Sequence, residues 1–162
     1  SLVLNNIKNV LKIADSQVAS RWGNICDFKN FDLITPNEKE ARFSLGDQDS
    51  SISNLTRELY KISKCRNLIL KLGSRGAFVV DNIKKSNTFS LPSFTTNVLD
   101  PVGAGDALLA YSTYGLLVSK SIVPASILGS LAAACACEND GNIPLDKKLI
   151  LKKIESLEKN LN

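Results

Sequence analysis

Four short apolar runs in the first part of the chain have the length and composition of buried β-strands. They fall at residues 10–15, 31–35, 67–72 and 77–80. The first two end on polar residues, as strands of a parallel sheet do where they deliver groups to a site. A glycine-containing turn joins the last two, whereas residues 82–98 show no regular pattern and are predicted to be irregular.

Between and after these runs the polar and apolar positions follow a helical pattern. Asn37 followed by Glu40 is a capping-box signal for a helix start, and Gly46 stands where that helix would stop. Further helices are predicted at residues 51–64, 103–118, 124–137 and 147–161. Strands alternating with helices indicate an α/β domain with a mostly parallel sheet flanked by helices.

Composition narrows the function classes. The 162 residues are 44% hydrophobic, enough for one domain with a continuous core, and we expect residues 1–162 to form a single domain. Twenty basic and sixteen acidic residues give a net charge of +4, which suits a small anionic ligand and falls short of a nucleic-acid-binding protein. No run of apolar residues reaches the length of a membrane span, so we expect a cytoplasmic protein.

Residue types that are absent add two expectations. The four cysteines have neither CxxC spacing nor a histidine to complete a zinc site, which favours free thiols in a reducing compartment. Without any methionine, Ser1 is not a translation start. We therefore expect the chain to be a fragment of a longer protein, or a protein whose beginning has been removed.

The strongest chemical signal is the run Gly103-Ala104-Gly105-Asp106, which opens an apolar helix. Small residues allow a tight turn, and the unpaired N–H groups of the first helical turn attract anions. A carboxylate in the same turn suits phosphoryl transfer, in which a base accepts the proton of the attacking hydroxyl. Taken alone, the run is equally compatible with an ordinary glycine-containing turn. It matches neither a P-loop nor a dinucleotide-binding fingerprint.

Three segments together resemble the ribokinase (PfkB) family of carbohydrate kinases. They are residues 34–41, 72–77 and 100–106, in the order and approximate spacing of that family. The resemblance implies a ribokinase-like fold and an ATP-dependent kinase. It also implies that this chain carries the C-terminal, nucleotide-binding part, while the N-terminal sugar-binding and lid part is absent.

The resemblance implies the following roles. Asp106 would be the catalytic base, and the backbone amides of Gly103, Ala104 and Gly105 would bind the developing phosphate charge. Asn37 and Glu40 would organise Mg²⁺ and the ATP phosphates, Glu40 through water, as Mg²⁺ chemistry favours. A purely structural capping box is the alternative interpretation of this pair.

The remaining candidate residues would contact the nucleotide or a second cation. Gly73, Ser74 and Gly76 would contact ATP, with Lys71 near its phosphates, although a strand lysine is also typical of an edge that reaches solvent. The alanine-rich helix that contains Ser130 would form the adenine wall, and core packing explains the same alanines. Asp100 and the Val102 carbonyl would form a site for a monovalent cation such as K⁺. The Asp15-Ser16-Gln17 cluster resembles the kinase half of ADP-heptose synthases.

The predicted function is an ATP-dependent phosphotransferase that acts on the hydroxyl of a sugar or sugar phosphate. A catalytically silent nucleotide-binding or regulatory module of the same fold is the alternative, and a vitamin-precursor kinase ranks third because such kinases tend to replace the Asp106 base. The predicted partners are ATP, Mg²⁺ and a sugar, with neither nucleic acid nor membrane. Family members often form homodimers, which makes self-association a further expectation.

Overall fold

The computed structural model describes residues 10–15, 24–81, 87–141 and 144–159. Its sheet has the strand order β1-β2-β3-β4-β5. The first three strands are parallel to one another, β4 pairs antiparallel with β3, and β5 pairs antiparallel with β4. Only β4 among them therefore runs against the others, which confirms the predicted mostly parallel sheet. The bounds are β1 (Ile13–Ala14), β2 (Leu33–Ile34), β3 (Asn67–Lys71), β4 (Ala77–Asp81) and β5 (Asn87–Leu91).

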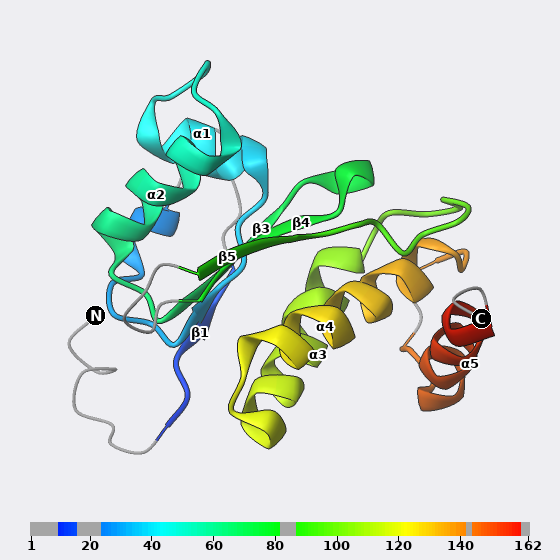
Figure 1. The fold of residues 1–162 in the computed structure, drawn as a ribbon. Helices are drawn as coiled ribbons and strands as arrows, with labels where there is room; N and C mark the ends of the chain where they lie inside the picture. The colour runs from blue at the N-terminus through cyan, green and yellow to red at the C-terminus, as the bar shows by residue number, and fades with distance from the viewer. Residues whose placement is uncertain (1–9, 16–23, 82–86, 142–143, 160–162) are drawn as a thin grey trace.

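Helices cover both faces of this sheet (Figure 1). On one face lie α1 (Glu38–Leu45) and α2 (Ile52–Ser63), and on the other lie α3 (Ala104–Ser119) and α4 (Ile122–Cys137), with α5 (Lys147–Lys159) packed beside α4. None of the helices in the described segments has the length and apolar character needed to cross a lipid bilayer.

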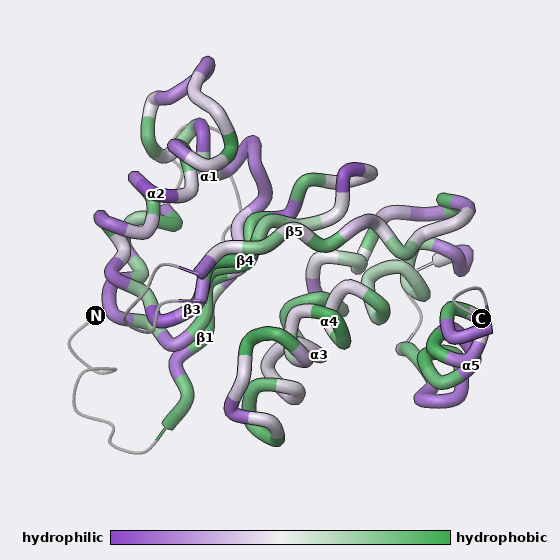
Figure 2. The backbone as a smooth tube through the Cα atoms, viewed as in Figure 1, coloured by the Kyte–Doolittle hydropathy of each residue, from purple (hydrophilic) through white to green (hydrophobic). Residues whose placement is uncertain are grey.

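Strand β3 shows why both faces must be covered. Leu68 and Leu70 pack into the cluster under α1 and α2, while Ile69 between them packs under α3 and α4. All three are fully buried, as the period-two alternation of a central strand requires. Figure 2 shows the hydrophobic colour gathered in the central strands, while α5 alternates hydrophobic and hydrophilic positions.

Most observed elements start or end within a few residues of their predicted bounds, and two differences have a clear physical reason. Helix α4 begins at Ile122 rather than at residue 124. Ser121 caps the helix, and a proline fits in its first turn because an N–H group there would have no intrahelical acceptor. The segment predicted to be irregular contains strand β5, whose Asn87, Thr88 and Ser90 are exposed. An exposed edge strand needs few apolar residues, and for that reason the hydrophobic pattern did not predict it.

Two glycines let α3 and α4 approach each other closely. A Cβ on Gly115 would lie 2.8 Å from the Cα of Ala125, and one on Gly129 would lie 2.0 Å from the Ser112 Oγ. Both contacts are shorter than van der Waals packing allows. The pair of helices is therefore held at a separation that larger residues would not permit.

Gly76 has a similar role where β4 meets β5. Its φ of +85° is paired with a ψ of −129°, a conformation open essentially to glycine alone. A Cβ there would lie 2.0 Å from the carbonyl oxygen of Leu91. The requirement for glycine at this position comes from the backbone of β5.

We expect Gly76→Ala to lower the free energy of unfolding by about 3 kcal/mol, since it combines backbone strain with a clash against Leu91. Gly73→Ala in the same turn is the matched control, because its Cβ would meet nothing within 4 Å and only its φ of +62° is strained, which costs about 1 kcal/mol. Urea denaturation of both variants measures the difference. Equal losses would contradict this account of Gly76.

Candidate nucleotide site at the carboxyl ends of the strands

A cavity of about 850 Å³, here named the main cavity, lies where β2 and β3 end and is walled by α3 and α4. Ligands of open α/β sheets bind at this edge. Many of the predicted site residues line it: Asn37, Lys71, Gly73, Ser74, Gly76, Ala104, Gly105 and Ser130. Of the other predicted residues, Glu40, Asp100, Val102, Gly103 and Asp106 are not part of its lining.

The first turn of α3 opens toward this cavity. Gly103 caps the helix with a φ of +81°, and no side chain caps it. Ala107 N–H donates to the Gly103 carbonyl, and Ala104 N–H donates to the Pro101 carbonyl at 3.3 Å. By helix geometry the N–H groups of Gly105 and Asp106 have no intrahelical acceptor, so they carry the positive end of the helix dipole. The Asp106 side chain in the same turn is exposed.

The predicted capping box is present at the start of α1. Asn37 N–H donates to Glu40 Oε2, and Glu40 N–H donates to Asn37 Oδ1, both at 2.8 Å. Glu40 is only 7% exposed, whereas Asn37 lines the main cavity. Asn37 therefore both caps α1 and lines the cavity, while one oxygen of Glu40 is held by the backbone.

Lys71 points inward, toward the candidate phosphate region. Its Nζ lies 2.7 Å from Asp15 Oδ2, and both side chains are about four-fifths buried, at 17% and 20% exposure. A Cβ built on Gly105 would lie 3.3 Å from that Nζ. The lysine predicted from β3 and the glycine predicted from α3 are thus neighbours. Of the predicted Asp15 cluster, Ser16 and Gln17 lie outside the described residues.

The deeper part of the main cavity is apolar. Phe94, Leu108, Ala133 and Ala134 are among its lining residues, while Ala132 is fully buried in the core. Ser130 Oγ is buried in this wall and has no hydrogen-bond partner among the described residues. An apolar slot with one unsatisfied hydroxyl suits a flat heteroaromatic base with a polar edge.

Asp100 organises the loop before α3. Its Oδ1 accepts the Val102 N–H at 2.9 Å, and the N–H groups of Leu99 and Asp100 both donate to the Cys137 carbonyl. The loop is thereby fastened to the end of α4. The described residues contain no cluster of three or more His, Cys, Asp or Glu side chains that could hold a metal ion by themselves.

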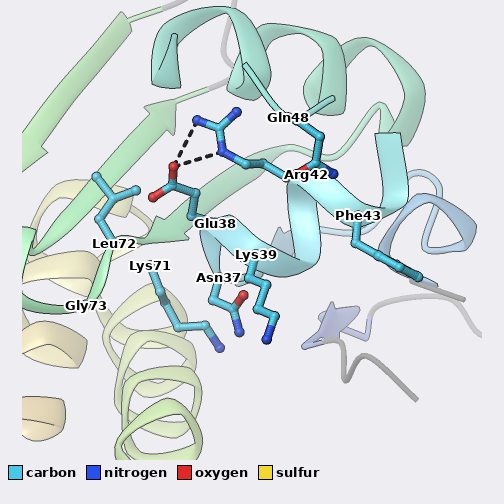
Figure 3. A pocket seen from close by; sticks show the side chains of 9 residues that line it. All are labelled: Asn37, Glu38, Lys39, Arg42, Phe43, Gln48, Lys71, Leu72 and Gly73. Carbon is cyan, nitrogen blue, oxygen red and sulfur yellow. Dashed lines mark hydrogen bonds and ion pairs between the residues drawn. The ribbon is translucent and has the colours of Figure 1, made fainter. Parts of the chain in front are cut away.

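A second pocket of about 530 Å³ adjoins the first on the α1 side and shares Asn37, Lys71 and Gly73 with it. In Figure 3 the side chains of Asn37, Lys39 and Lys71 extend in the same direction, whereas Arg42 turns back to Glu38. Lys39 lines this pocket but is not among the residues predicted from the sequence, where its position two residues after Asn37 was the only signal for it.

Comparison with known proteins decides the family. The sequence profile of the pfkB family of carbohydrate kinases matches residues 5–148. The chain belongs to this family. Within the curated pfkB-related proteins, the bifunctional protein HldE of Nitrobacter winogradskyi is 29% identical over 117 residues, which cover 70% of this chain and 24% of that protein.

Solved structures show the same ribokinase-like fold. Phosphofructokinase-2 from Escherichia coli, in complex with potassium, superposes with a TM-score of 0.75 at 23% identity and covers 90% of this chain and 47% of its own. Ribokinase of Arabidopsis thaliana, complexed with ribose and ATP, superposes with a TM-score of 0.73 at 23% identity, covering 88% and 47%. The present chain thus spans about half the length of these solved chains.

In this pfkB-family chain, Glu138 ties the rim of the main cavity to α5. Its Oε1 accepts the Thr96 N–H and hydroxyl at 2.7 and 2.9 Å, and the Lys153 ammonium at 2.5 Å. Burial raises the pKa of Glu138, but the hydrogen bonds from Lys153 and Thr96 outweigh it and hold the pKa below its ordinary value. The charged form of Glu138 therefore stabilises the rim.

We expect this contribution to depend on pH. Because the pKa of Glu138 is lower in the folded chain, its stabilisation is complete above the unfolded value near 4.5 and is lost as the pH falls through the folded value. Glu138→Gln should lower the free energy of unfolding by about 1–2 kcal/mol at neutral pH and by less at pH 3, which lies below the unfolded value. Urea denaturation at both pH values tests this, and an equal loss at both would contradict it.

Proposed function

We propose that this chain is the nucleotide-binding part of an ATP-dependent sugar kinase. The observation that carries the proposal is that the open N-terminus of α3, Lys71 and the 73–76 turn all border the main cavity. The first two features favour phosphate, and the apolar slot beside Ser130 suits a purine. The Arabidopsis ribokinase complexed with ribose and ATP supports this assignment by its shared fold.

In the proposed reaction, a sugar hydroxyl attacks the γ-phosphorus of ATP. The Asp106 carboxylate accepts the hydroxyl proton, a new O–P bond forms, and the bond to the bridging oxygen breaks to release ADP. Gly105 and Asp106 N–H groups would donate to the transferring phosphoryl oxygens. The Ala104 N–H is directed at the Pro101 carbonyl and contributes less, while Gly103 sets the turn that aims these groups.

Magnesium fits this chain as an ion held through water. Asn37 and Glu40 hydrogen-bond to each other's backbone through one oxygen each, so they would hold Mg²⁺ mainly by its water ligands. When bound with ATP, the ion would neutralise phosphate charge. Asp100 and the Val102 carbonyl provide oxygen donors suited to a monovalent cation, and the phosphofructokinase-2 solved with potassium supports testing K⁺ first.

In this proposal, the sugar or sugar phosphate is bound mainly by the part of the kinase that this chain does not span. Asp106 is exposed, so a hydroxyl can reach it from outside the main cavity. The same geometry without turnover would make the chain a nucleotide-binding module, and the two experiments below separate these functions.

We expect Asp106→Asn to lower kcat by about 10²–10⁴ in the complete kinase, because proton transfer to a positioned base contributes that much. The Kd for ATP should change less than about threefold, since the proposed contact of Asp106 is with the sugar hydroxyl and not with the adenine. Asp49→Asn, an exposed carboxylate in the loop before α2, is the control. Unchanged kcat in Asp106→Asn would refute its role as the base.

ATP binding by the chain itself can be followed at Cys137, whose thiol lines the main cavity. ATP at ten times its Kd should slow alkylation of Cys137 by about tenfold, by mass action. Cys26 is a matched control, since it lies outside the cavity and burial likewise raises the pKa of its thiol. Loss of reactivity at both thiols, or at neither, would contradict a nucleotide in the main cavity.

A further inference from the structure

The ion pair between Asp15 and Lys71 spans the end of a strand. Asp15 follows β1 and Lys71 ends β3, while β2 lies between them in the sheet. Neighbouring strands are about 4.8 Å apart, so two strands separated by a third cannot place side chains in contact through pairing alone. Both side chains must reach across the end of β2 to meet at 2.7 Å.

The pair meets at the N-terminus of α3. A Cβ on Gly105 would lie 3.3 Å from Lys71 Nζ and 3.8 Å from Asp15 Oδ2. The carboxylate therefore stands close to the helix turn whose N–H groups are open to an anion. Because Gly105 has no side chain, nothing on α3 separates the pair from that turn.

From this placement we infer that Asp15 is a positioning residue that holds Lys71 and competes with phosphate for it. The inference rests on the proposed nucleotide function of the main cavity. Without nucleotide, Asp15 occupies one donor of the Lys71 ammonium and directs that side chain toward Gly105. When phosphate binds, the ammonium turns its donors to the phosphate oxygens and the hydrogen bond to Asp15 weakens.

The electrostatic consequence is a site that binds phosphate more weakly than its lysine alone would allow. About 80% of each side chain is shielded from solvent, so the mutual attraction is screened less than that of a surface pair. A carboxylate this close also repels the phosphates directly. Asp15 thus lowers ground-state affinity while keeping Lys71 aligned for the transfer step, which favours release of product.

The test measures binding of ATP and of inorganic tripolyphosphate to the 162-residue chain, in EDTA so that divalent metal plays no part. We expect D15N to bind both about tenfold more tightly and K71M to bind both about tenfold more weakly. The gain from D15N should be at least about threefold smaller in the K71M background, because sharing of the ammonium is then absent. D15E, which keeps the charge, should bind like the wild-type chain.

Circular dichroism and thermal melting establish that each variant is folded, and Asp49→Asn serves as the control for a change of net charge at an exposed residue that lines neither pocket. D15A provides a second removal of the carboxylate should D15N prove unstable. In the complete kinase, D15N should lower both KM for ATP and kcat, a combination that a purely structural defect would not produce.

Equal or weaker binding of tripolyphosphate by folded D15N would overturn the proposal, whether or not the wild-type chain binds ATP. An equal gain in the K71M background would overturn it too, since Asp15 would then act only as a like charge. Failure of ATP to protect Cys137 while D15N still gains tripolyphosphate affinity would instead count against the nucleotide site and leave the Asp15–Lys71 inference standing.

Discussion

The close contact between α3 and α4 sets the position of the candidate site. Gly115 meets Ala125 and Gly129 meets Ser112 at distances that exclude any Cβ, so the two helices cannot separate or slide without losing this contact. Since the helices are antiparallel, the first turn of α3 and the last turn of α4 lie at the same end. The main cavity forms between these ends and the carboxyl edge of the sheet. The open N-terminus of α3 and the apolar wall that contains Ser130 are thus positioned by one helix pair.

The charged side chains at this edge of the sheet are a largely buried ion pair and an exposed carboxylate. Lys71 faces Asp15 and the N-terminus of α3, while Asp106 in the same helix turn is exposed. A phosphate bound near Lys71 would therefore have a carboxylate on the solvent side, which is the arrangement that transfer to an incoming hydroxyl requires. The charged Glu138 side chain fastens the loop that contains Thr96 to the end of α4 and to α5.

Two residues that line the main cavity also have a structural role. Asn37 caps α1 and lines the main cavity, and Gly76 lines the cavity while avoiding a clash with the backbone of β5. Lost activity on changing either residue would not by itself establish contact with ATP. Lys71 and Asp15 are better probes, because their side chains form an ion pair with each other at 2.7 Å beside the first turn of α3.

The sequence by itself determined the local features. The spacing of apolar residues predicted the α/β class, and the Asn37 and Glu40 pair predicted the start of α1. The Gly103 to Asp106 run predicted an open helix N-terminus. Each of these features depends on neighbours within a few residues. Only the tertiary structure decided the rest. Strand β5 is held by pairing with β4 rather than by its own composition, and the partnership of Asp15 with Lys71 joins residues 56 positions apart across an intervening strand. Such contacts depend on strand order and helix packing, which no local pattern encodes.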